Sequence, residues 1–221
     1  MFWDWKLTAD IWPLLLQASV VTVQATILGF AIAAVLGLLL AIGRMYGRPW
    51  LRVPLGGIVE FIRSTPLLIQ IFFLYFVLPE FGVVLDAMTA GVLAIGVHYA
   101  TYASEVYRAG LANIPRGQWE ASTALNLTPY HTFRDIIIPQ AIPPVVPALG
   151  NYLVALFKET PLLSAIGVLE LMQTAKIIGS ETFRYTEAIT LVGLIFLVFS
   201  ILAAGLIKVV ETRLNRRVTR P

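Results

Sequence analysis

Long apolar stretches make up most of the chain, and short polar stretches separate them. Residues 11–43 contain no charged side chain. A membrane-spanning helix needs about 20 mostly apolar residues, so this stretch is long enough for one tilted helix. The whole pattern predicts five spans, at about residues 13–43, 53–78, 87–111, 139–165 and 187–209. One polar interruption, at about residues 112–138, separates the third span from the fourth.

Small residues recur at every fourth position of the first span, at Gly29, Ala33, Gly37 and Ala41. Residues four apart lie on the same face of a helix, and small side chains let two helix backbones approach closely. This face is therefore predicted to pack against another helix. The alternative is that Gly is simply frequent in membrane helices.

The composition indicates lipid as the main solvent of the chain. Hydrophobic residues make up 58% of it and charged residues only 13%, whereas soluble domains carry roughly 25% charged residues. The absence of cysteine excludes disulfides, thiol catalysis and cysteine-based metal sites. The two histidines, His98 and His131, lie in different surroundings, so no metal site is expected.

The distribution of basic residues predicts the orientation in the membrane. Segments rich in Lys and Arg usually lie in the cytoplasm. If the N-terminus is outside, the inner segments hold eleven basic residues, namely Arg44, Arg48, Arg52, Arg108, Arg116, Arg134, Lys208, Arg213, Arg216, Arg217 and Arg220. The outer segments then hold three, namely Lys6, Lys176 and Arg184. We therefore expect the N-terminus outside and the C-terminus inside. The modest net charge of +3 and this clustering indicate topology and not nucleic-acid binding.

The polar interruption fits two short helices at the cytoplasmic surface. The first is predicted over about residues 117–125, and Asn126 can adopt the left-handed conformation that ends a helix. The second begins with Thr128 as a cap and Pro129 at the first helical position. Such a pair can lie on lipid head groups or dock into a groove of a partner protein. Because only Arg116 and Arg134 are basic here, docking to a protein is favoured.

Three separated motifs stand out in the chain. Residues 117–127 read GQWEASTALNL and are followed by PQA at residues 139–141, residues 158–167 read KETPLLSAIG, and residues 60–70 read EFIRSTPLLIQ. The first resembles the EAA loop of ABC-importer permeases, and all three resemble segments of the polar amino acid subfamily of these permeases. The resemblance covers about residues 15–212.

Three positions depart from the family pattern. Asn126 stands where the EAA loop usually has Gly, Glu159 where Asp is usual, and Pro161 where Ser is usual. Asn tolerates left-handed geometry, so the bend after the first short helix is expected to form. Glu159 and Pro161 lie where the solute is expected to pass, so these two departures from the family pattern leave the identity of the solute open.

The resemblance implies an all-α integral membrane protein with the type I ABC importer permease fold, located in the bacterial inner (plasma) membrane. Such permeases work in pairs, on an ATPase dimer, and receive solute from an extracytoplasmic binding protein. ATP and Mg are then expected on the ATPase, and no cofactor on this chain. The chain has no GxxxxGK[ST] phosphate loop and is not expected to be an enzyme. The sequence leaves open whether the second permease is identical or merely related.

The expected solute is a polar amino acid or a compatible solute. Within the subfamily, the runs at residues 157–164 and 180–185 most resemble permeases of ectoine and hydroxyectoine importers. Glutamine, glutamate and arginine are the alternatives.

The resemblance also implies that the first short helix of the EAA loop is a coupling helix that docks into the ATPase. The residues expected to make this contact are Gly117, Gln118, Glu120, Ala121, Ala124, Leu125 and Asn126. The two alanines are small enough for close approach, and Glu120 can pair with a basic residue of the partner. The plain alternative for Glu120 is an ordinary solvated acid on a helix.

Polar residues inside the predicted spans are candidates for the solute pathway, because charges there are costly. Together with neighbours in the family motifs, the candidates are Glu60, Thr65, Gln70, His98, Tyr102, Lys158, Glu159, Thr160, Leu163 and Ser164. Lys158 and Glu159 follow a proline-dense stretch, where a broken helix can expose its ends to a zwitterionic solute. The alternative for Glu60 is a structural ion pair with Arg63, one helical turn away. The alternative for His98 is a hydrogen-bonded packing role.

Two other classes of protein are weighed against this interpretation. A self-sufficient secondary transporter is disfavoured because the chain is short, lacks an inverted repeat and carries a docking loop. A membrane enzyme with Ser64, Ser104 or Ser164 as nucleophile is disfavoured because no His or Lys lies at a convincing local spacing.

Overall fold

The computed structural model of the chain describes residues 3–218, with side chains described for residues 3–214. Regular structure in this part of the chain is entirely helical. The helices are α1 (Trp5–Tyr46), α2 (Pro49–Ser64), α3 (Leu67–Phe72), α4 (Ala87–Ala112), α5 (Arg116–Ala124), α6 (Pro129–His131), α7 (Ile138–Glu159), α8 (Leu171–Thr182) and α9 (Tyr185–Val218). Shorter π-helical turns occupy Phe73–Val77 and Thr132–Ile137, and 3-10 turns occupy Leu78–Phe81 and Thr160–Ile166.

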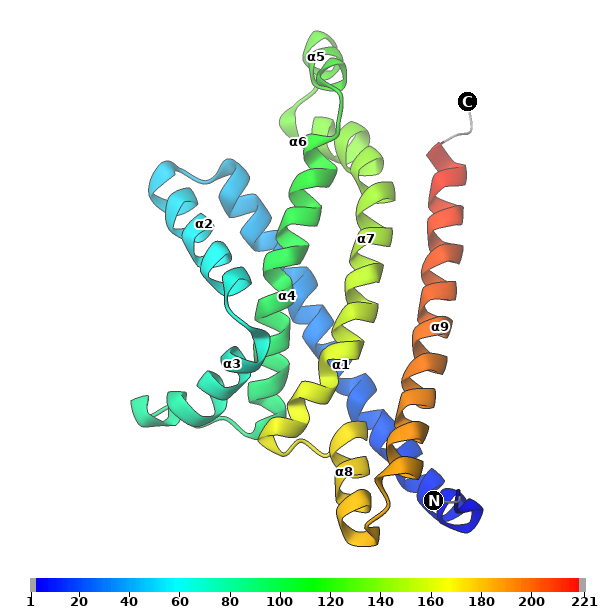
Figure 1. The fold of residues 1–221 in the computed structure, drawn as a ribbon. Coiled ribbons are helices and arrows are strands. Elements are labelled where there is room, and N and C mark those ends of the chain that lie inside the picture. Colours follow the sequence, from blue (N-terminus) through cyan, green and yellow to red (C-terminus); the bar gives the residue numbers. More distant parts are fainter. Residues whose placement is uncertain (1–2, 219–221) are drawn as a thin grey trace.

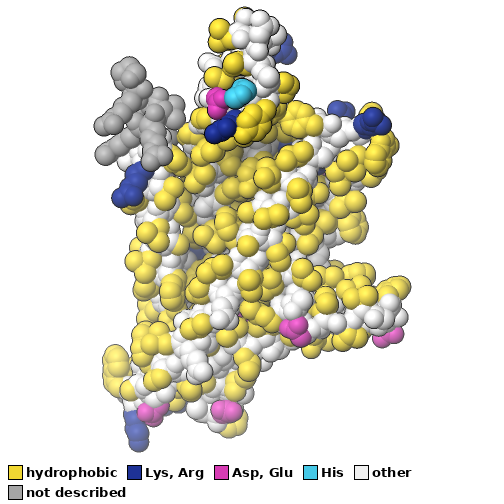
Figure 2. All heavy atoms as spheres, turned by 180° about the vertical axis from the view of Figure 1, so that it is seen from behind, with side chains coloured by type: hydrophobic (Ala, Val, Ile, Leu, Met, Phe, Trp, Pro, Cys, Tyr) yellow, Lys and Arg dark blue, Asp and Glu magenta, His cyan; other side chains and the backbone are white. Residues whose placement is uncertain are grey.

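The long helices run between two opposite ends of the molecule. The end with α5 also holds the C-terminal part of α9, whereas the N-terminus and α8 lie at the other end (Figure 1). Figure 2 shows hydrophobic side chains over the middle of one face, with Lys and Arg gathered mainly at the α5 end and acidic side chains mainly at the opposite end. An apolar belt between two polar ends is the surface expected of a protein that crosses a bilayer.

Several helical stretches are suited to crossing a membrane. Within the described residues, three stretches are long and apolar enough, namely Trp5–Tyr46, Pro129–Ile166 and Tyr185–Leu214. The bent pair of Pro49–Ser64 and Leu67–Phe81 is a fourth if it counts as one span. The 26 residues of α4 extend over about 39 Å of helix. α4 is less apolar than these stretches, because its second half carries polar side chains that face α1, α2 and α3 instead of lipid.

The most extensive helix pair is α1 with α4, which meet along the stripe of small residues. All four residues of that stripe are buried. A methyl group added to Gly37 would lie 2.7 Å from Cβ of Ala103 and 2.9 Å from the carbonyl oxygen of Ala100. On α4, a methyl group added to Gly96 would lie 2.8 Å from Cβ of Ile32. The predicted close approach is confirmed, and α4 is the helix that packs there.

The sequence pattern suggested one continuous helix for the second span, but the structure divides this span into two helices. α2 ends at Ser64, and Thr65 has an extended backbone with φ −106° and ψ 141°. Proline has no N–H to donate, and it disfavours the helical conformation in the residue before it. Pro66 therefore separates α2 from α3, and the two helices are bent by 105°.

The prolines of α7, in contrast, do not break the helix, and the expectation of a broken helix there is wrong. Pro143, Pro144 and Pro147 all lie inside α7. Neighbouring helices and local π-helical turns can compensate the lost hydrogen bonds, and α7 packs against both α4 and α9. The helical stretch runs from Pro129 to Ile166, so the second short helix of the predicted interruption is the beginning of this stretch. α7 itself ends at Glu159.

The segment after α7 forms a further short helix, α8. The Glu170 side chain caps α8 by accepting hydrogen bonds from the backbone N–H groups of Met172 and Gln173, at 2.9 and 2.8 Å. Burial raises the pKa of the Glu170 carboxyl, and the two backbone hydrogen bonds oppose that shift. The backbone N–H of Leu171 donates to Oγ1 of Thr22 on α1 at 3.2 Å, which ties α8 to the first helix.

The close approach of α1 and α4 predicts the effect of one added methyl group. Gly37→Ala should lower the free energy of unfolding by about 1–3 kcal/mol, because the new Cβ overlaps α4. The matched control is Gly205→Ala on α9, where a Cβ meets nothing within 4 Å and the usual gain is roughly 0.5–1 kcal/mol. Thermal unfolding in detergent, followed by tryptophan fluorescence, measures both. Equal melting temperatures for the two variants would contradict the packing described here.

Candidate functional site

One face of α4 carries polar side chains that meet three other helices. His98, Tyr102 and Glu105 are spaced four and three residues apart, so they share this face. His98 Nδ1 lies 3.1 Å from Oε1 of Gln70 on α3. The guanidinium carbon of Arg63 on α2 lies 5.1 Å from the ring centre of Tyr102, a cation–π contact. Glu105 meets α1 and α2, so this face of α4 is where α1, α2 and α3 are held together.

Three arginines surround the carboxylate of Glu105. Arg44 Nη1 lies 2.5 Å from Oε1, Arg108 Nε lies 3.2 Å from Oε2, and Arg63 Nη1 lies 3.9 Å from Oε1. The Arg44 and Glu105 side chains are only 16% and 32% exposed. Partly desolvated charges of this kind need partners, so Glu105 and the arginines tie the ends of α1 and α2 to α4.

The sequence suggested a structural ion pair between Glu60 and Arg63. The described residues form no such pair. Arg63 reaches Glu105 on α4, and Glu60 accepts a hydrogen bond from Oγ of Ser64 at 3.5 Å. Residues three apart on one helix can pair, but the long arginine side chain finds a partner on a neighbouring helix instead. Glu105 was not a site candidate, because two of its three partners, Arg44 and Arg63, are distant in sequence.

A cluster of aromatic rings continues from this polar face toward α7. The ring centre of Tyr102 lies 5.3 Å from that of His98, 6.0 Å from that of Tyr99 and 5.8 Å from that of Tyr152. Tyr152 belongs to α7, so the cluster lies between α4 and α7. Tyr99 and Tyr152 were missed as candidates. Tyr99 lies three residues from Tyr102 on the same helix, whereas only the cross-helix contact shows that Tyr152 belongs with them.

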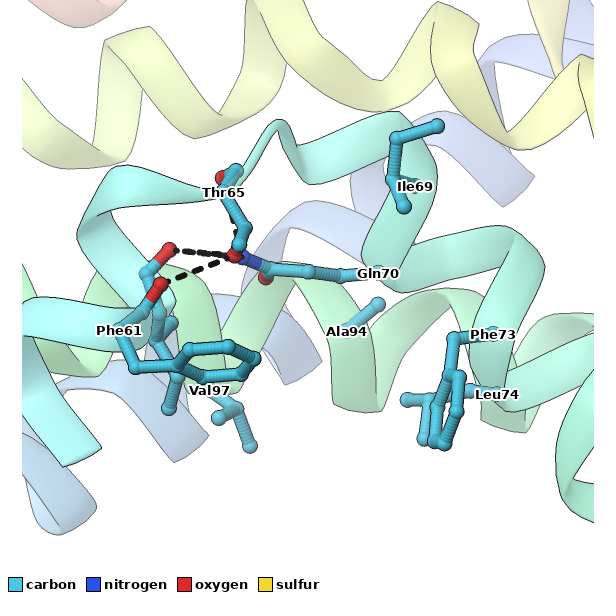
Figure 3. A pocket seen from close by; sticks show the side chains of 9 residues that line it. Phe61, Thr65, Ile69, Gln70, Phe73, Leu74, Ala94 and Val97 are labelled. Atoms are coloured by element: carbon cyan, nitrogen blue, oxygen red, sulfur yellow. Dashed lines mark hydrogen bonds between the residues drawn. The ribbon is translucent and has the colours of Figure 1, made fainter.

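The bend between α2 and α3 encloses a second group of candidates (Figure 3). The side-chain amide of Gln70 points back at the bend, and its Nε2 lies 2.8 Å from Oγ1 of Thr65. A mainly apolar cavity of about 320 Å³ adjoins these two side chains, and it is lined by Phe61, Ile62, Thr65, Ile69, Gln70, Phe73, Leu74, Ala94 and Val97. Thr65, Gln70 and His98 thus lie together, as one hydrogen-bonded chain.

Lys158 and Glu159 lie at the end of α7 but face different neighbours. Lys158 lines a groove against α9, together with Phe196 and Ser200 among others. Glu159 is half-buried and lies close enough to Tyr99 for an electrostatic interaction. The two charges therefore diverge within one chain, in contrast to the expectation that both approach one zwitterion.

The remaining candidates after α7 serve packing in this structure. Thr160 is fully buried, and its hydroxyl donates to the carbonyl of Phe157 at 2.7 Å. Leu163 is fully buried and fills the space beside Gly91, where an added Cβ would overlap it. Ser164 is half-buried in the 3-10 turn.

The coupling candidates on α5 and just after it are all exposed. These are Gly117, Gln118, Glu120, Ala121, Ala124, Leu125 and Asn126. Leu125 leaves 71% of its surface uncovered, although it is apolar. Asn126 has a left-handed backbone with φ 52°, as its sequence predicts. α5 protrudes from the end of the molecule (Figure 1), so its outer face is free to meet a partner.

The inner face of α5 is anchored to two long helices. Trp119 packs edge-on against Phe133, with ring centres 5.4 Å apart, and Phe133 packs against Tyr46 at the end of α1 at 6.0 Å. Gln140 on α7 donates a hydrogen bond to Oε1 of Gln118 at 3.2 Å. α5 is therefore connected to α7 by a direct hydrogen bond and to α1 through the ring of Phe133.

Comparison with known proteins identifies the family. The model of the family described as "Binding-protein-dependent transport system inner membrane component" matches residues 33–216. A probable amino-acid ABC transporter permease protein of Sinorhizobium fredii, y4tG, is 46% identical, and the match covers 94% of this chain and 90% of that protein. The L-cystine transport system permease protein TcyB of Bacillus subtilis is 34% identical, over 99% of this chain and 93% of that protein.

Solved structures agree with the sequence relatives. A chain of an amino acid ABC transporter crystallised with histidines has a TM-score of 0.91 and 34% identity, and the match covers 96% of this chain and all of that one. A chain of the MetNI methionine ABC transporter in an inward-facing conformation has a TM-score of 0.65 and 26% identity, over 93% of this chain and 94% of that one. The chain therefore belongs to the inner membrane components of binding-protein-dependent transport systems, the multi-pass permease subunits of ABC transporters.

Proposed function

We propose that the chain is the permease subunit of an ATP-driven importer and forms half of the pathway for a polar amino acid or a similar small solute. It crosses the membrane five times, with the N-terminus outside and the C-terminus inside. A second permease, an ATPase dimer and an extracytoplasmic binding protein complete the transporter, and ATP and Mg bind to the ATPase. Relatives named for amino-acid and cystine transport support this assignment.

The exposed outer face of α5 is the observation that carries the proposal. All seven coupling candidates are exposed, and they include the small Ala121 and Ala124 and the apolar Leu125. Small residues and an apolar anchor suit a helix that inserts into a groove of a protein partner. α5 also lies at the end where basic side chains gather (Figure 2), which is the cytoplasmic end by the distribution of charge.

The anchors of α5 supply the coupling. When the ATPase closes on ATP, it displaces α5, and the Trp119–Phe133–Tyr46 contacts and the Gln118–Gln140 hydrogen bond carry this displacement to α1 and α7. α7 also borders the aromatic cluster and ends at Glu159. Motion at the cytoplasmic end thus reaches the polar groups deep in the bundle, which is what alternating access requires.

Glu159 and the tyrosine cluster favour a solute with a cationic group. A carboxylate attracts an ammonium group directly, and aromatic faces attract cations through their π-electrons. The ammonium of an amino acid fits both, and so does the delocalised amidinium of ectoine or hydroxyectoine. The proposal commits to the polar amino acids, and the ectoine-type solutes suggested by residues 157–164 and 180–185 are the alternative.

Reversing the charge on the outer face of α5 should uncouple the transporter. In a complex reconstituted with its ATPase and binding protein, Glu120→Arg should reduce solute uptake roughly 10-fold or more, because a charge at a docked interface loses its partner. Glu211→Arg makes the same change at an exposed position of α9 and should leave uptake unchanged. Unaltered uptake and unaltered solute-stimulated ATP hydrolysis in Glu120→Arg would remove the coupling assignment.

Neutralising Glu159 tests the solute class. Glu159→Gln should lower uptake roughly 10-fold, because the amide keeps an acceptor oxygen but loses the negative charge that attracts an ammonium group, and Glu211→Gln is the control. Uptake into proteoliposomes is measured for glutamine, glutamate, arginine, ectoine and hydroxyectoine. Uptake of at least one amino acid, and its loss in Glu159→Gln, is the expected result. Uptake of the ectoines alone would replace the amino-acid assignment, and full activity of Glu159→Gln would remove Glu159 from the pathway.

A further inference from the structure

The bend at Pro66 creates a backbone problem inside the bundle. In a continuous helix, the carbonyl of Ile62 would accept a hydrogen bond from the N–H of residue 66, but proline has none. α2 is 16 residues long, which places its last turn about 20–24 Å from its first. Backbone groups that leave the helical pattern at this depth of a membrane protein need another hydrogen-bond partner.

The backbone N–H of Thr65 reaches the Ile62 carbonyl only at a long 3.4 Å, and the side chain of Gln70 supplies the short contact. Its Nε2 lies 2.7 Å from the carbonyl oxygen of Ile62, 3.2 Å from that of Thr65 and 2.8 Å from Oγ1 of Thr65. The Thr65 hydroxyl in turn lies 3.1 Å from the carbonyl oxygens of Phe61 and Ile62. Figure 3 shows the Gln70 amide pointing into the bend from α3. The amide nitrogen faces only acceptors, so the orientation of the amide group is fixed.

The orientation of Gln70 also fixes the hydrogen on His98. With the nitrogen turned to the bend, Oε1 of Gln70 faces Nδ1 of His98 at 3.1 Å. A carbonyl oxygen only accepts hydrogen bonds, so Nδ1 of His98 carries the hydrogen. The other ring nitrogen, Nε2, takes no part in holding the bend. This chain of hydrogen bonds runs from α4 through α3 to the last turn of α2.

The same contacts use up most of the hydrogen-bonding capacity of these side chains. Both N–H groups of Gln70 are engaged at the bend, its carbonyl is engaged with His98, and the Thr65 hydroxyl both donates and accepts. Side chains committed in this way have little left to offer a passing solute. They do determine where α2 ends, and hence where Arg63 meets Tyr102 and Glu105.

We infer that Thr65, Gln70 and His98 form a clamp that holds the bend between α2 and α3 against α4, and that His98 is a positioning residue that acts through Gln70 and not a solute contact. The uptake measurements below rest on the proposed function. The stability measurements do not.

Two substitutions of His98 separate its two ring nitrogens. In His98→Asn the side-chain amide nitrogen is attached at the position of Nδ1, and in His98→Gln it is attached at the position of Nε2. The clamp predicts that His98→Asn melts at a higher temperature than His98→Gln and keeps the maximum uptake rate within about twofold, since the hydrogen bond to Gln70 is retained although the ring contact with Tyr102 is lost. His98→Gln should lower the melting temperature and reduce the maximum uptake rate about 5- to 100-fold, since the half-buried carbonyl of Gln70 loses its donor.

The half-saturating solute concentration distinguishes positioning from solute contact. A clamp residue should change the maximum rate and leave half-saturation unchanged, whereas a solute contact through Nε2 should shift half-saturation and make His98→Gln the better tolerated variant. Hydrogen exchange of residues 62–70, followed by mass spectrometry, should rise in His98→Gln and not in His98→Asn.

A second variant tests the clamp at its centre. Gln70→Glu keeps the size and the acceptor oxygen but removes the N–H groups that satisfy Ile62 and Thr65, so hydrogen exchange of residues 62–70 should rise here too. If the proposed function is wrong, wild type shows no uptake, yet the order of melting temperatures still decides the clamp. Equal stability of His98→Asn and His98→Gln, or unchanged exchange in Gln70→Glu, would overturn the inference.

Discussion

Each backbone carbonyl deep in a bilayer needs a hydrogen-bond donor within the protein, and this requirement governs the molecule. Pro66 breaks the second predicted span and leaves the carbonyl of Ile62 without its normal donor. Gln70 supplies one at 2.7 Å, and His98 holds Gln70 from α4. The bend is therefore a fixed feature of the fold and not a loose connection. It sets the place where Arg63 reaches the aromatic and acidic side chains of α4.

The rest of the structure has two parts. The helices α1, α2 and α4 are packed tightly together, whereas α7 connects the exposed α5 to the interior of the bundle. α1 and α4 approach so closely that a single methyl group on Gly37 would overlap Ala103, and the arginines around Glu105 hold α2 to the same unit. α7 instead joins α5 at one end to the tyrosine cluster and Glu159 at the other. If an ATPase docks on α5, as proposed, α7 connects the docking site to the polar interior.

The sequence predicted features that depend on local patterns. Apolar stretches located the helices, the four-residue spacing of small side chains located the face that α1 presents to α4, and Thr128, Pro129 and Asn126 located the ends of the short helices. These features follow from periodicity and from the conformational preferences of single residues. The resemblance of three motifs identified the family, which the comparisons show independently.

The sequence did not predict features that depend on contacts between distant segments. Arg63 was paired with Glu60 because the two share a helix, but its partner Glu105 lies on α4. The prolines of α7 were expected to break that helix, but packing against α4 and α9 preserves it, whereas the single Pro66 produces a 105° bend. Lys158 and Glu159 were placed together by adjacency, although helix geometry directs them to different neighbours. Local patterns carry no information about which neighbour compensates a missing donor or charge.

The claim that α5 is the docking helix for an ATPase can be tested directly, because the chain has no cysteine of its own. Ala121→Cys, labelled with a photoactivatable benzophenone maleimide, is cross-linked within the complex assembled with its ATPase and binding protein. The control is Val84→Cys, which is 78% exposed near the opposite end of the molecule. The account predicts an adduct of the permease with the ATPase from position 121 and none from position 84. An ATPase adduct from position 84 but not from position 121 would contradict it.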